Sequence, residues 1–168
     1  WDAVYERKPP PGFRWMTESF GTNWRLTEFQ AAIGRLQLAK LPHWTEARRA
    51  HARLLTDGFA GVSLLRVPQP PAHVGHACYK FYTFVRPQEL AAGWSRDRIM
   101  TELNARGIPC TVGSCSEIYL ERAFTDRGWG LTERLPVARS LGETSLMFLI
   151  HPTLPREALA ATVEAMRQ

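Results

Sequence analysis

The sequence predicts an α/β (α+β) domain in which helices pack on a small, mostly antiparallel sheet. Residues 28–57 carry apolar side chains at the i, i+3, i+4 spacing of amphipathic helices. From residue 61 onward, short aromatic and β-branched segments alternate with helical segments between Gly and Pro residues. Since these short segments lack the long strand–helix–strand repeat of a parallel sheet, we expect their pairing to be antiparallel.

Two helices are expected to lead the domain. Thr27 and Gln30 have the spacing of a capping box, in which each side chain satisfies an N–H of the helix start. Pro42 lacks an N–H and is expected either to break the helical ladder or to lie in the first turn of a second helix. The expected leading elements are a helix from Glu28 to Lys40 and a second one ending near Asp57, with Gly58 as its cap.

The remaining elements follow from changes in hydrophobic period. The segment 145–150 is apolar nearly throughout, so we expect a strand that is buried on both faces. Ser95 is a candidate helix cap. The expected strands are 63–67, 79–85, 108–112 and 145–150, and the expected helices are 96–106, 136–141 and 156–166, with a helical turn within 117–123. The domain organisation is therefore an irregular, Pro-rich arm over 1–20, then a single domain over 21–168 with mixed α/β structure over 61–168.

Composition limits the classes of function. The chain has 168 residues, 45% of them hydrophobic, and a net charge of +5 that comes almost entirely from arginine. We expect no nucleic-acid partner, since no recognition motif is present, and no membrane segment, since no apolar run is long enough. Cys78, Cys110 and Cys115 are expected to be reduced thiols of a cytoplasmic protein, without a metal. Because residue 1 is Trp and not Met, we expect an N-terminal portion to be missing.

A polar loop precedes the first helix. Its residues, Gly21 to Arg25, place the Asn23 amide and the Arg25 guanidinium beside the positive end of a helix dipole. This arrangement suits an anion, above all a phosphate.

The same residues carry a family resemblance. The stretch from Gly21 to Leu38, GTNWRLTEFQAAIGRLQL, resembles a segment of the DegT/DnrJ/EryC1/StrS family of pyridoxal-phosphate sugar aminotransferases. Family-like stretches follow in the same order at residues 76–82, 107–110 and 151–154. The resemblance implies the small C-terminal domain of a fold-type-I pyridoxal-phosphate-dependent transferase. It also implies a homodimer, a nucleotide-linked keto sugar as substrate and glutamate as amino donor.

The resemblance also suggests site residues. Asn23 matches the asparagine that reaches the partner subunit's cofactor phosphate, and Arg25 matches the neighbouring arginine; a turn-forming Asn23 is the alternative. His76 and Tyr79 fall where family members approach the sugar nucleotide, although a structural histidine is equally compatible. Glu117 and Tyr119 are further candidates for the substrate side, at a place where other members often carry proline and histidine.

The catalytic lysine is not expected within this chain. In the family it lies upstream of the asparagine segment, within a Gly-rich stretch that is absent here, so the chain alone is expected to be inactive. Two alternatives remain open. One is a pyridoxamine-phosphate-dependent sugar dehydratase of the same family, and the other is a non-catalytic domain for sugar-nucleotide binding or oligomerisation.

Overall fold

The computed structural model describes residues 25–168. The predictions for the arm 1–20 and for Asn23 fall outside the described residues. The elements follow in the order α1 (Glu28–Phe59), β1 (Leu65–Arg66), β2 (Phe81–Val85), η2 (Pro87–Glu89), α2 (Arg96–Ala105), β3 (Cys110–Thr111), η3 (Ile118–Leu120), α3 (Arg122–Thr125), α4 (Pro136–Thr144), β4 (Ser145–Phe148) and α5 (Arg156–Arg167).

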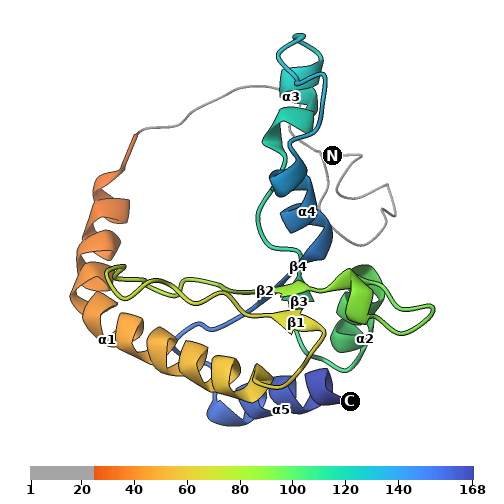
Figure 1. The fold of residues 1–168 in the computed structure, drawn as a ribbon. Helices are drawn as coiled ribbons and strands as arrows, with labels where there is room; N and C mark the ends of the chain where they lie inside the picture. The colour runs from red at the N-terminus through yellow and green to blue at the C-terminus, as the bar shows by residue number, and fades with distance from the viewer. Residues whose placement is uncertain (1–24) are drawn as a thin grey trace.

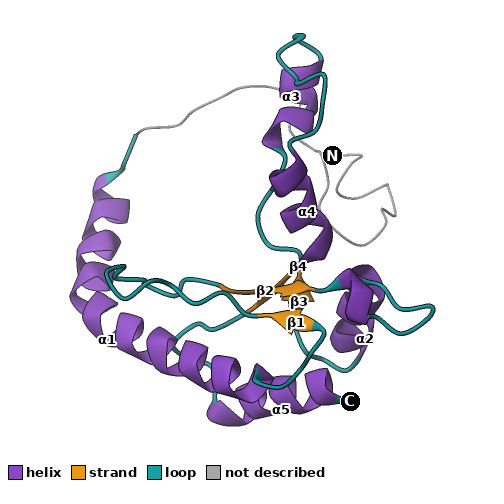
Figure 2. Cartoon of the chain, in the orientation of Figure 1, coloured by secondary structure: helices purple, strands orange, loops and turns teal. Residues whose placement is uncertain are grey.

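The four strands form one antiparallel sheet in the order β1-β2-β4-β3. Figure 2 shows this sheet at the centre of the structure, with α1 and α5 below it. Phe81 lies opposite Phe148, and Phe148 in turn lies opposite Cys110. β4 is buried at all four positions, which confirms that this segment is covered on both faces. The α/β class with an antiparallel sheet is therefore confirmed.

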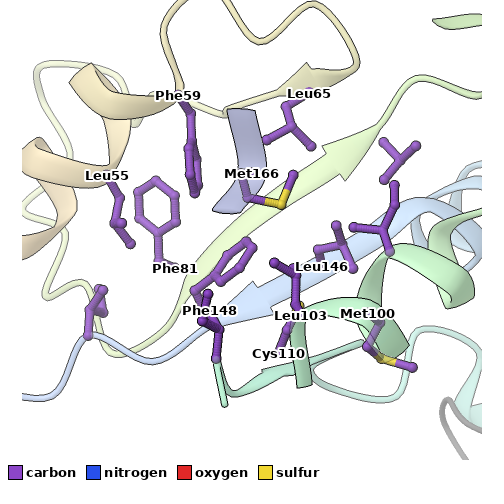
Figure 3. Packing of buried hydrophobic residues seen from close by; sticks show 14 of the residues in the cluster. Leu55, Phe59, Leu65, Phe81, Met100, Leu103, Cys110, Leu146, Phe148 and Met166 are labelled. Atoms are coloured by element: carbon purple, nitrogen blue, oxygen red, sulfur yellow. The ribbon is translucent and has the colours of Figure 1, made fainter. Parts of the chain in front are cut away.

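The hydrophobic core lies between the sheet and three helices. α1 and α5 pack against each other beside the sheet, and α2 lies at the other end of the strands (Figure 1). Phe59 of α1 contacts Phe148 and Phe81, with ring centroids 5.5 and 6.1 Å apart (Figure 3). Leu55 and Leu146 are both 0% exposed in the same cluster. Burial of these side chains supplies most of the driving force for folding.

α1 corrects the expectation of two leading helices. It is one continuous helix from Glu28 to Phe59, with Pro42 inside it. Pro42 removes only one backbone hydrogen bond, and the packing of the second half of the helix on α5 and the sheet outweighs that loss. Gly58 is not a cap: it lies within the last turn, where an added Cβ would overlap both methyl groups of Val163 on α5. Gly58 therefore permits close approach of the two helices.

The two helix caps predicted from the sequence are confirmed. The Thr27–Gln30 capping box is present, with the Thr27 Oγ1 accepting from the Gln30 N–H at 3.2 Å. Ser95 caps α2 through the Arg98 N–H at 3.1 Å. The edge strands β1 and β3 have two residues each and are shorter than the predicted strands 63–67 and 108–112.

Two parts of the chain extend beyond the sheet layer (Figure 1). One is the first half of α1, where Phe29, Ile33 and Leu36 are 75%, 42% and 66% exposed. The other is the pair of helices α3 and α4, which also exposes large apolar side chains such as Val137. No helix within residues 25–168 combines the length and the apolar character that crossing a bilayer requires.

Candidate functional site

A groove lies between α1, the segment 68–80 and β2. It has a volume of about 1060 Å³, and His76 and Tyr79 both line it. Two predicted site residues therefore share one concave surface. Glu117 and Tyr119 do not line the groove, although Ser114 of the same loop does.

His76 stabilises a tight turn at the groove wall. Its Nδ1 accepts from the Cys78 N–H at 3.1 Å and lies 3.2 Å from the Cys78 Sγ. Cys78 has a φ of 49°, in the left-handed region that non-glycine residues rarely adopt. On the helix side, Arg49 donates through Nε to the His76 carbonyl at 3.0 Å. These contacts fix the segment 76–78 against α1 and correspond to the structural alternative for His76.

Tyr79 lies at the open edge of the groove. Its side chain is 73% exposed, and the Lys80 Nζ lies 5.8 Å from the centroid of its ring. An exposed aromatic ring beside a cation can stack on a flat ligand such as a nucleobase. Further along β2, Tyr82 forms a hydrogen bond with Ser114 over 3.1 Å.

Glu117 is an internal carboxylate. It is 2% exposed, and Arg134 donates to both of its oxygens, with Nε 2.8 Å from Oε1. The Tyr119 hydroxyl donates to the same Oε1 at 2.6 Å and accepts from the Leu135 N–H at 2.9 Å. These hydrogen bonds lower the pKa of Glu117 to about 2. Together they form an internal lock, defined here as Glu117, Tyr119 and Arg134, that joins η3 to the start of α4.

The role of Glu117 and Tyr119 in substrate binding stays a prediction. The contacts in the chain are those of a structural lock, because Arg134 already occupies both carboxylate oxygens. The partner in this lock was not predicted from the sequence. Arg134 is separated from Glu117 by 17 positions, and nothing in the local sequence around Glu117 identifies this arginine as its partner.

Changing Glu117 to Gln is expected to reveal the lock through its pH dependence. The folded pKa of Glu117 is lowered from 4.5 to about 2, so its stabilisation is present above pH 4.5 and is lost as the pH falls toward 2. At pH 7 we expect Glu117→Gln to lower the free energy of unfolding by about 1–2 kcal/mol, a value reduced by the partial exposure of Arg134. Urea unfolding at several pH values measures this difference. A difference that stays constant from pH 7 to pH 3 would contradict the assignment, and Glu133→Gln is the matched control.

Arg25 lies in an extended segment just before α1. It is exposed and precedes the N-cap Thr27 by two positions. The capping box already satisfies the N–H groups of Thr27 and Gln30, so a ligand here would meet the Arg25 guanidinium and the N–H groups of the first turn. An anion is the ligand that fits such donors.

The comparison with known families decides what kind of protein this is. The model of the DegT/DnrJ/EryC1/StrS aminotransferase family matches residues 7–167. The chain belongs to this family. The family resemblance read from the GTNWR segment is thereby confirmed.

Relatives and solved structures give the closer context. The chain is 31% identical over 152 residues to a dTDP-3-amino-3,4,6-trideoxy-alpha-D-glucose transaminase of Streptomyces venezuelae, covering 90% of this chain and 38% of that protein. It is 28% identical to a UDP-N-acetyl-3-dehydro-alpha-D-glucosamine 3-aminotransferase of Acidithiobacillus ferrooxidans, covering 99% and 44%. The structure of an aminotransferase from Psychrobacter cryohalolentis matches with a TM-score of 0.80 and 49% identity over 99% of this chain and 44% of that one. The chain therefore spans about two fifths of the length of these DegT-family relatives.

More distant structures share the fold. They include Spr1654 of Streptococcus pneumoniae in a PLP form and a PMP form, and a GDP-4-keto-6-deoxymannose-3-dehydratase, at 22–24% identity. Pyridoxal phosphate, with its pyridoxamine form, is the cofactor associated with this family of aminotransferases.

Proposed function

We propose that this chain is the C-terminal portion of a pyridoxal-phosphate-dependent aminotransferase that converts nucleotide-linked keto sugars to amino sugars. The observation that supports this proposal is the family match over residues 7–167, in a chain that covers only 38% and 44% of the length of the two transaminase relatives described above. Relatives whose names specify dTDP-linked and UDP-linked sugars support the substrate class. Glutamate as donor, homodimer assembly and a cytoplasmic location belong to the same proposal.

The chain's part in holding the cofactor is assigned to the start of α1. Arg25 and the helix start fit a phosphate because they combine a permanent cation with the N–H groups of a first helical turn, which have no partner within the helix itself. Asn23, which lies outside the described residues, is proposed to bind the same phosphate across the subunit boundary. The cofactor, when bound, supplies the electron sink for the transfer of the amino group. The residues of this chain orient its phosphate.

The covalent anchor of the cofactor is proposed to lie upstream of this chain. The described residues contain two lysines, Lys40 and Lys80. Lys40 is exposed on α1, where its Nζ lies 5.8 Å from the ring of Trp44, and Lys80 lines the groove next to Tyr79. Neither lysine is close in sequence to Arg25 or to the first turn of α1, where the cofactor phosphate is proposed to bind. The third lysine of the sequence, Lys8, falls outside the described residues and is followed directly by three prolines. We propose that the 168-residue chain alone has no transaminase activity.

Borohydride reduction tests the location of the anchor. The full-length protein, loaded with pyridoxal phosphate, is reduced and digested, and its peptides are mapped by mass spectrometry. We expect one stoichiometric cofactor label on a lysine upstream of Trp1, and none on the isolated chain treated in the same way. A stoichiometric label on Lys80 in either sample would contradict the proposal.

A dehydratase is the second candidate function. Dehydratases occur among both the relatives and the solved structures that match the chain. In that case the upstream lysine would be replaced by histidine, and borohydride would label no residue of the full-length protein. The residue at the anchoring position therefore separates the two reactions.

A further inference from the structure

A second pocket lies between the turn after η2, the helix α2 and the C-terminal end of α5, at the right of Figure 1. This α2–α5 pocket has a volume of about 310 Å³ and shares no lining residue with the groove beside α1. Its volume is at the lower end of the range of small-molecule sites, so it fits a ligand about the size of a single substituted ring.

The inner surface of the α2–α5 pocket is apolar. Ile99 and Leu103 of α2 and Met166 of α5 line it, and all three belong to the buried core. Leu64 and Leu90 also line the pocket and pack, partly buried, against the same core. A ligand with an apolar body removes this surface from water when it binds, and the hydrophobic effect favours such a ligand.

Trp94 adds an aromatic surface to the α2–α5 pocket. Its side chain is 40% exposed, and the Arg98 Cζ lies 4.5 Å from the centroid of its ring. Arg98 also donates through Nη1 to the Gly93 carbonyl at 3.0 Å, so it fastens this turn to the first turns of α2. Arg98 does not line the pocket, whereas Trp94 does. The indole therefore offers the pocket a surface of the kind that attracts both flat apolar groups and cations.

The charged groups of the α2–α5 pocket favour a cation over an anion. Two carboxylates line it, those of Glu89 and Glu102, against one cation, Arg106. Within residues 25–168 the Glu89 carboxylate forms no ion pair, and the Glu102 Oε1 lies 4.0 Å from the Arg98 Nε, with both side chains about half exposed. Arg106 donates to the neutral Gln168 side chain at 2.9 Å. The lining therefore combines an apolar inner surface with an excess of negative charge.

We propose that the α2–α5 pocket binds a small organic cation with an apolar body, such as an aromatic quaternary ammonium ion. The apolar body lies on the buried side chains of α2 and α5, and the charged group lies beside Glu89 and the Trp94 ring. The inference goes beyond the proposed function and does not depend on it, because this pocket is separate from both the groove and Arg25.

Calorimetric titration of the full-length, cofactor-loaded protein with benzyltrimethylammonium tests the inference. This probe carries a ring and a permanent positive charge, and it cannot form an imine with pyridoxal phosphate. We expect it to bind about tenfold more tightly than tetramethylammonium, which lacks the ring and buries less apolar surface. We expect a difference of about tenfold from phenylacetate as well, since phenylacetate carries the opposite charge.

Substitutions of the charged lining residues locate the binding site. Glu89→Gln/Glu102→Gln should raise the dissociation constant for benzyltrimethylammonium about fivefold, and Arg106→Gln should lower it about twofold by removing the opposing charge. Glu157→Gln is the matched control, because it removes a carboxylate at the other end of α5, outside the pocket, and should bind as the wild type does. Because Arg106→Gln predicts a gain, the test does not depend on the double variant folding well.

Four results would overturn the assignment. The first is a wild-type protein that does not bind benzyltrimethylammonium, and the second is binding of tetramethylammonium or phenylacetate that is equally tight. The third is a dissociation constant that neither the double variant nor Arg106→Gln changes. The fourth is competition by an excess of UDP, which would place the probe at the nucleotide-sugar site; we expect UDP to leave the dissociation constant unchanged.

Discussion

Replacing Phe148 with alanine is expected to destabilise the domain by about 3–5 kcal/mol, the usual cost of truncating a buried phenylalanine. Phe148 is 1% exposed at the end of β4. It lies between Phe81 and Cys110 in the sheet register and packs on Phe59 of α1. The variant therefore leaves a cavity where the sheet meets α1. Urea unfolding followed by tryptophan fluorescence measures the loss.

Leu149 provides the control for this prediction. It is the next residue along the chain and is 41% exposed. Leu149→Ala should cost at most about 1 kcal/mol, since little apolar surface is lost. Equal losses for the two variants would contradict the burial of Phe148 in the core, because Leu149 follows β4 and is partly exposed to solvent.

Replacing Arg25 with alanine is expected to weaken cofactor retention by the full-length protein at least tenfold. The variant removes a cation that is proposed to bind the cofactor phosphate, and charge-assisted hydrogen bonds of this kind contribute roughly 1.5–3 kcal/mol each. Equilibrium dialysis against pyridoxal phosphate measures the dissociation constant. Asn23→Ala should act in the same direction.

Arg35 is the matched control for Arg25. It is an exposed arginine on α1, two turns beyond the start of the helix, whereas Arg25 precedes the helix. Arg35→Ala should leave the dissociation constant for pyridoxal phosphate unchanged, since the helix dipole acts only within the first turn. An equal effect of the two substitutions would indicate a general loss of positive charge and would contradict a specific phosphate site.

Local signals in the sequence predicted local structure well. The capping box at Thr27 and the Ser95 cap depend on residues three positions apart, so they could be predicted without the fold. The prediction that Pro42 separates two helices was wrong. It took into account the hydrogen bond that proline cannot form, but not the tertiary packing that stabilises the second half of α1.

Contacts between residues that are distant in sequence could not be predicted from local patterns. Nothing local indicates that Arg134 binds Glu117, since their pairing depends on how η3 and α4 are placed. The apolar stripe of Phe29, Ile33 and Leu36 correctly indicates a helix, but these side chains are exposed in this chain. Periodicity predicts the apolar face of a helix and does not identify what covers it.

The proposed reaction of the full-length protein is the transfer of an amino group from glutamate to a nucleotide-linked keto sugar. The full-length protein, loaded with pyridoxal phosphate, is incubated with glutamate carrying a nitrogen isotope and with UDP- and dTDP-linked keto sugars, and the sugars are analysed by mass spectrometry. We expect the labelled nitrogen to move from glutamate into a nucleotide-linked sugar. A cofactor-loaded protein that transfers no labelled nitrogen to any of these sugars would contradict it, and a sugar that loses oxygen without gaining nitrogen would identify the dehydratase reaction.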